Sequence, residues 1–234
     1  NTSLLIKATP GETVKIQYYG SKIENSDIQG IYDAGMVFNA DSYPAFGLQT
    51  MGEKAIAATQ PDGNMSLDLK IEQVKQYPTK DGEVTEILLK DKVYPFEIKQ
   101  YYKAYQGTDI ISTWIEIMNN GKKSVTLYRF VSAYLPVQRG DNWLTHFHGH
   151  WGAGNMLEEE KLTNGQKVIS NKDGMVNTET DNPSFMLSID GKPQEEYGHI
   201  LGGTLAWTGN YLLKMDITNT KLNIIAGINE ENSH

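Results

Sequence analysis

Residues 81–121 read DGEVTEILLKDKVYPFEIKQYYKAYQGTDIISTWIEIMNNG. This stretch contains three runs rich in Val, Ile, Thr, Tyr and Trp, which are Val84–Leu89, Tyr94–Tyr105 and Ile110–Met118. The pairs Asp81-Gly82 and Asn120-Gly121 flank the runs, and such pairs tolerate the positive φ angles that tight hairpins need. The stretch therefore predicts consecutive antiparallel strands joined by short turns.

The same pattern continues on both sides of this stretch. Further strand-like runs are Leu4–Ala8, Val14–Tyr19, Val125–Leu135, Trp143–His150, Lys167–Ser170, Phe185–Ile189, Thr204–Trp207, Tyr211–Ile217 and Leu222–Ile225. Only Met156–Lys161 suggests helix, and it predicts a single turn. Ser21–Gly52 and Asn171–Pro183 predict long loops. We predict an all-β sandwich with few short helical turns, and, because no linker interrupts the chain, a single domain over residues 1–234.

Composition excludes several classes of protein. The chain has 234 residues, a net charge of −8 and no cysteine. An acidic surface repels phosphate backbones, so we expect no nucleic-acid partner. No apolar run approaches the about 18 residues of a membrane-spanning helix, so we expect no membrane partner either. Residues 1–8 lack the pattern of a signal peptide. We expect a periplasmic or extracellular protein, with the cytoplasm as an open alternative.

The densest group of chemically active residues is WLTHFHGHW, residues 143–151. On a strand, His146, His148 and His150 would share one face because side chains alternate with period two. Three imidazoles on one face could bind zinc, nickel or iron.

Together with Gly140, the first two histidines have the spacing of the first half of a cupin metal motif. That motif also needs a glutamate three or four residues further on. Gly152 and Ala153 stand there instead, and the nearest glutamate is Glu158. We therefore predict no metal and no cofactor, and keep a cupin-like metal enzyme as a less favoured alternative.

Aromatic residues are the better candidates for ligand contact, since an aromatic face stacks on the apolar face of a sugar ring. Trp151 lies between Gly149 and Gly152, so we predict that it is exposed to ligand. Trp114 and Trp207 are predicted to fill the core. The loop carboxylates fit no paired catalytic pattern and are interpreted as solvated or turn-capping groups; they include Asp33, Asp41, Asp141 and Asp181.

Seven segments in order resemble the N-terminal domain of glycoside hydrolase family 36, the bacterial α-galactosidases. They are Tyr43-Pro-Ala-Phe-Gly47, Gly63–Leu69, Tyr101–Asn120, His148-Gly-His-Trp-Gly152, Asn182–Leu187, Gly203–Tyr211 and Ala226-Gly-Ile-Asn229. Each is weak alone, but together they cover most of the chain. Many relatives carry an Arg-Glu pair after the Gly-x-Trp segment, whereas this chain has Ala153, Gly154, Asn155 and Met156.

The resemblance implies a large antiparallel β-supersandwich that precedes a (β/α)8 barrel, which supplies both catalytic aspartates. It implies that this chain is a non-catalytic part of a retaining α-galactosidase, and that its partners are the galactoside substrate, its own barrel and other copies in a homo-oligomer. Trp151 falls where it would help to close the galactose pocket, and Asp33 and His148 are the accompanying candidates for substrate binding. A free-standing carbohydrate-binding module is the alternative.

Overall fold

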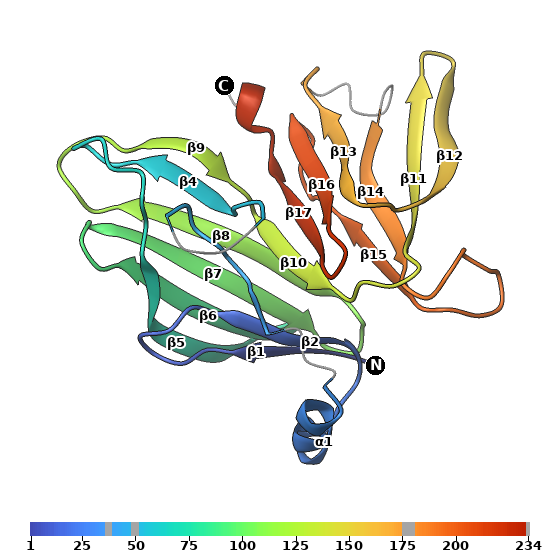
Figure 1. The fold of residues 1–234 in the computed structure, drawn as a ribbon, viewed down its shortest axis with the longest axis horizontal. Helices are drawn as coiled ribbons and strands as arrows, with labels where there is room; N and C mark the ends of the chain where they lie inside the picture. Colours follow the sequence, from blue (N-terminus) through green and yellow to red (C-terminus); the bar gives the residue numbers. More distant parts are fainter. Residues whose placement is uncertain (36–38, 48–51, 175–180, 233–234) are drawn as a thin grey trace. The chain divides into compact units, whose positions relative to one another are not determined.

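The computed structural model describes residues 1–35, 39–47, 52–174 and 181–232 (Figure 1). Strands make up nearly all of its regular structure, and the described residues contain one short α-helix, α1 (Ile28–Asp33). The prediction of an all-β, antiparallel fold is confirmed. Among these residues, no helix has the length and apolarity needed to cross a bilayer.

The described chain divides into two compact units, Asn1–Pro136 and Val137–His234. Strand β10 (Ala133–Val137) spans the boundary between them. The single domain over residues 1–234 stays a prediction.

The first unit is built from three antiparallel sheets. One has the order β1-β2-β3, a second pairs β4 with β9, and the third has the order β5-β6-β7-β8. Their bounds are β1 (Thr2–Lys7), β2 (Lys15–Ser21), β3 (Ala40–Asp41), β4 (Ile56–Thr59), β5 (Leu69–Thr79), β6 (Gly82–Asp91), β7 (Phe96–Tyr105), β8 (Ile111–Asn119) and β9 (Thr126–Phe130).

Residues 81–121 form strands β6, β7 and β8 of this unit. Strands β6, β7 and β8 follow one another through short turns; buried apolar side chains alternate with less buried ones over Ile87–Leu89 of β6 and Phe96–Ile98 of β7, whereas β8 has no fully buried residue. Ile87 and Ile98 are fully buried on β6 and β7. Burying one such side chain contributes about 1.5–3 kcal/mol, so the alternation fixes which face of the sheet is apolar.

The second unit contains two antiparallel sheets. One has the order β12-β11-β14-β15, so β12 lies at its edge, and the other includes β17-β16-β13. Their bounds are β11 (Trp143–His150), β12 (Ala153–Lys161), β13 (Gly165–Asn171), β14 (Asp181–Ser188), β15 (Ile200–Thr204), β16 (Tyr211–Ile217) and β17 (Leu222–Ile228). Apolar side chains from both sheets are buried, including Leu144, Leu187, Tyr211 and Leu222.

Several local predictions were wrong. Met156–Lys161 is part of strand β12, because pairing with β11 over its whole length overrides the helical preference of three successive glutamates. The predicted loop Ser21–Gly52 contains the 3-10 helix Asn25–Asp27 followed by α1. The predicted strand Val125–Leu135 is two strands, β9 and β10.

Candidate functional site

The candidate site lies on the hairpin formed by β11 and β12 (Figure 1). In its register His146 faces Glu158, His148 faces Met156 and His150 faces Ala153, which leaves Trp151 and Gly152 as a two-residue turn. Gly152 has φ +80°, a conformation that glycine adopts without strain. A Cβ at Gly149 would come within 2.8 Å of the Ala153 carbonyl oxygen, so the close approach at the turn also requires glycine.

Trp151 stands at the tip of this hairpin and is 85% exposed. The exposed apolar side chains Met156 and Leu157 follow it on β12. At the turn, the Nδ1 atom of His150 lies 2.9 Å from the Trp151 carbonyl oxygen. A large aromatic surface exposed to water is typical of a contact site for a ligand or another protein surface.

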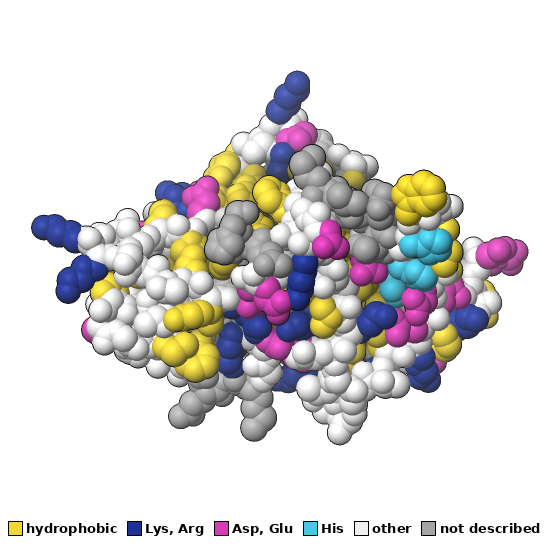
Figure 2. Space-filling model, turned by 90° about the horizontal axis from the view of Figure 1, so that it is seen from above, with side chains coloured by type: hydrophobic (Ala, Val, Ile, Leu, Met, Phe, Trp, Pro, Cys, Tyr) yellow, Lys and Arg dark blue, Asp and Glu magenta, His cyan; other side chains and the backbone are white. Residues whose placement is uncertain are grey.

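His148 lies on β11 below the tip and is partly exposed. Its Nε2 atom is 3.5 Å from the Glu158 Oε2 atom. Histidine side chains lie beside acidic side chains on the surface shown in Figure 2. The structure thus places the predicted residues Trp151 and His148 on the same hairpin, three residues apart.

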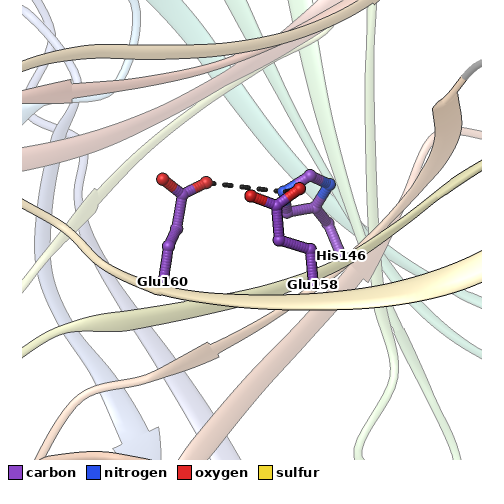
Figure 3. A group of neighbouring side chains, drawn as sticks. All are labelled: His146, Glu158 and Glu160. Carbon is purple, nitrogen blue, oxygen red and sulfur yellow. Dashed lines mark ion pairs between the residues drawn. The ribbon is translucent and has the colours of Figure 1, made fainter.

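A polar cluster lies beneath His148, on the same face of β11. The Nε2 atom of His146 is 3.4 Å from Glu160 Oε1 and 3.6 Å from Glu158 Oε2, and the two glutamates point toward the imidazole (Figure 3). Glu160 also forms an ion pair with Lys167, which comes from β13 in the other sheet. His146 is only 3% exposed.

The two glutamates were not predicted as partners of the histidines. A cupin motif places its glutamate three or four residues further along the chain, whereas Glu158 reaches His146 and His148 across the hairpin. The alternation of Glu158 and Glu160 on one strand face was the available signal, but it was hidden by the predicted helical turn.

Asp33 belongs to the other unit. It ends α1, is exposed, and accepts a hydrogen bond of 2.8 Å from the Gln29 side chain. Among the remaining loop carboxylates, Asp41 accepts a hydrogen bond from Thr13 and pairs with Lys15. Asp141 forms an ion pair of 2.6 Å with Lys161, and the hydrogen bond from this lysine lowers the pKa of Asp141.

The prediction that Trp114 and Trp207 fill the core was wrong. Both are substantially exposed. Trp114 stacks on Tyr101 across β7 and β8 with ring centroids 4.8 Å apart. The Trp207 indole N–H donates a hydrogen bond of 3.1 Å to the Asn210 carbonyl oxygen. Each indole is therefore held by a local partner at the surface.

Comparison with known proteins gives a consistent group of relatives. The family model described as the glycosyl hydrolase family 36 N-terminal domain matches residues 12–234. The chain is 25% identical to α-galactosidase Mel36A of Lactobacillus acidophilus over 263 residues, which cover 98% of this chain and 36% of that protein. It therefore spans about a third of the length of this relative.

Solved structures show the same fold. The crystal structure of the GH36 α-galactosidase AgaA from Geobacillus stearothermophilus matches with a TM-score of 0.86 at 19% identity, covering 98% of this chain and 36% of that one. A variant of AgaA in complex with stachyose matches with a TM-score of 0.87 at 20% identity, with the same coverage.

Proposed function

The chain belongs to the glycosyl hydrolase family 36 N-terminal domain family, and from this we propose that it is the non-catalytic N-terminal domain of an α-galactosidase. In this proposal it helps to shape the pocket that binds terminal α-galactosyl residues, and it takes part in subunit contacts. The bond would be broken by carboxylates on a separate catalytic domain. The observation that carries the proposal is the exposed Trp151 at the tip of the β11–β12 hairpin.

The hairpin has the properties of a pocket wall. A two-residue turn on two paired strands fixes the backbone that carries the indole, so little backbone entropy is lost when a ligand stacks on it. His148 offers a partly exposed ring nitrogen on the same hairpin for a hydroxyl group. Asp33 remains a candidate for substrate binding, with weaker support.

The surroundings of Trp151 also favour a surface that another part of the protein covers. Met156 and Leu157 are also exposed, on opposite faces of strand β12 in the same hairpin. Exposed apolar side chains such as these are stabilised by burial against another surface. We propose that this surface is the catalytic domain of the same polypeptide or of another copy in a homo-oligomer.

Two measurements test the proposal. Isothermal titration of the 234-residue protein with galactose, melibiose and raffinose should show weak or no binding, because the rest of the pocket lies on the catalytic domain. The complete polypeptide should hydrolyse an aryl α-galactoside, whereas the 234-residue protein should not. Tight binding by the 234-residue protein alone would favour a free-standing carbohydrate-binding module, and hydrolysis by it at an enzymatic rate would refute the proposal.

A further inference from the structure

The polar cluster in the middle of the hairpin includes three side chains that the proposed function does not use, His146, Glu158 and Glu160, next to His148. Four groups converge from two paired strands: His146 and His148 from β11, and Glu158 and Glu160 from β12. The ligand atoms of His146, Glu158 and Glu160 all lie within 4.8 Å of one another. Glu158 Oε2 lies between the two imidazoles, 3.6 Å from His146 Nε2 and 3.5 Å from His148 Nε2.

His146 gives a second, independent indication. Its side chain is 4% exposed, and neither ring nitrogen has a hydrogen-bond partner among the described residues. A buried polar group without a partner is unfavourable, and such groups are rare in native proteins. The Nε2 atom points at two carboxylate oxygens at distances longer than a good hydrogen bond. This leaves room for a small cation between them.

We infer that His146, His148, Glu158 and Glu160 form a binding site for a divalent transition-metal ion such as Zn²⁺. Metal–ligand bonds of about 2.0–2.2 Å place neighbouring ligand atoms of a tetrahedral site about 3.3–3.6 Å apart. The three nitrogen–oxygen separations in the cluster are 3.4, 3.5 and 3.6 Å. Small rotations would therefore bring His146, Glu158 and Glu160 around one ion, and His148, whose ring centroid lies 6.3 Å from that of His146, would turn inward to complete the site.

The ligand types select the class of ion. Imidazole and carboxylate together suit zinc, iron and related transition metals. Calcium takes six to eight oxygen ligands, and magnesium keeps most of its water, so neither matches two imidazoles with two carboxylates. The chain has no cysteine, so thiolate-bound metals are excluded here.

Lys167 already places a positive charge next to the proposed metal site. Its ammonium group contacts Glu160 Oε1, the same oxygen that faces His146. Glu160 Oε1 can bind the ion and keep the lysine, since an ionised carboxylate has about four lone-pair sites, two on each oxygen. The two carboxylates, the lysine and neutral imidazoles carry a net charge of −1, which favours a divalent cation.

A metal here would join β11 to the edge strand β12 below the turn that carries Trp151. It would restrain both strands in the middle of the hairpin. Metal binding is measured directly on the 234-residue protein, so its failure and the failure of the proposed sugar-binding role are distinguishable.

The test is calorimetric titration of Zn²⁺ into tag-free, chelator-treated protein, with Co²⁺ as a spectroscopic probe. We expect one Zn²⁺ per chain, and visible Co²⁺ absorption bands of tetrahedral nitrogen and oxygen ligation. Glu158→Gln should lower the affinity at least ten-fold. Glu158 is 46% exposed, so the variant should fold, and circular dichroism checks this. Glu159→Gln is the matched control, because Glu159 lies on the opposite face of β12, with Lys192 3.9 Å away. This variant should bind Zn²⁺ with unchanged affinity.

The nearest competing explanation is a protonated His146 held by the two carboxylates as an ion pair. In that case Zn²⁺ would not bind stoichiometrically, and the His146 resonances would not respond to Zn²⁺ in an NMR titration. Either result overturns the inference. Equal affinities of the Glu158→Gln and Glu159→Gln variants would also overturn it, because the ion would then bind elsewhere.

Discussion

Replacing Trp151 by alanine separates a role in substrate binding from a role in stability. Trp151 is 85% exposed, so its side chain contributes little to the folded core. We expect Trp151→Ala to change the free energy of unfolding by less than about 0.5 kcal/mol, as is usual for surface substitutions. The same exposure leaves a whole face of the indole available for stacking on a sugar.

The expected effect on catalysis follows from the area that stacking would cover. Covering one face of an indole removes roughly 100 Å2 of apolar surface from water, which corresponds to about 2.5 kcal/mol at ~25 cal/mol per Å2. If this contact persists in the transition state, kcat/KM falls by about 70-fold. Part of the indole would stay exposed to water at the rim of a pocket, which makes the contact weaker. The smallest decrease in kcat/KM that we expect is therefore about ten-fold.

The assay is kcat/KM of the complete polypeptide on an aryl α-galactoside, together with chemical denaturation of each variant. Tyr197→Ala is the control, since Tyr197 is another exposed aromatic residue of the same unit, 75% exposed, outside the hairpin. We expect it to leave kcat/KM unchanged. An unchanged kcat/KM in Trp151→Ala, or equal losses in both variants, would refute the pocket role.

Three further predictions concern stability. A Cβ at Gly203 would lie 2.4 Å from the ring of the buried Phe185, so Gly203→Ala should destabilise the protein by about 1–3 kcal/mol in urea denaturation, whereas Gly202→Ala, with its nearest neighbour 4.0 Å away, should cost much less. Leu144 is fully buried, and Leu144→Ala should cost about 2–5 kcal/mol in the same assay. Burial raises the pKa of Tyr102 to about 12; because the unfolded pKa is about 10, its contribution is complete below pH 10 and is lost as pH rises toward 12. Thermal melts across this range should therefore show a less steep loss of stability in Tyr102→Phe than in the unchanged protein, and identical slopes would contradict the assignment.

Sequence patterns predicted the strands that are dense in apolar or aromatic residues. The bounds of β11 and β16 match the predicted runs Trp143–His150 and Tyr211–Ile217, which contain dense apolar or aromatic residues. Strand β5 (Leu69–Thr79) went unpredicted because most of its side chains are exposed, so its sequence lacks apolar alternation. Strand β12 is likewise mostly exposed, and its pairing with β11 could not be deduced from its own residues.

The candidate site was predictable only in part. Trp151 was predicted to be exposed because neighbouring glycines let a ring stand clear of the backbone, but the same feature next to Trp207 was passed over, and Trp207 is exposed as well. The meeting of His146 with Glu158 depends on the register of the hairpin and on the irregular pairing between His148 and His150. The register of two paired strands is set by the geometry of the turn and by which face of the sheet is buried. The residues of β11 or β12 taken alone reveal neither.

The place of β12 at the margin of its sheet has a consequence for solubility. A marginal strand leaves a row of backbone donors and acceptors open to another chain, which is how many β proteins begin to aggregate. Glu158, Glu159 and Glu160 lie in succession along this strand. When two such strands approach each other, their carboxylates repel, so Glu158 and Glu160 of the cluster, together with Glu159 on the other face, also discourage the sheet from growing by self-association.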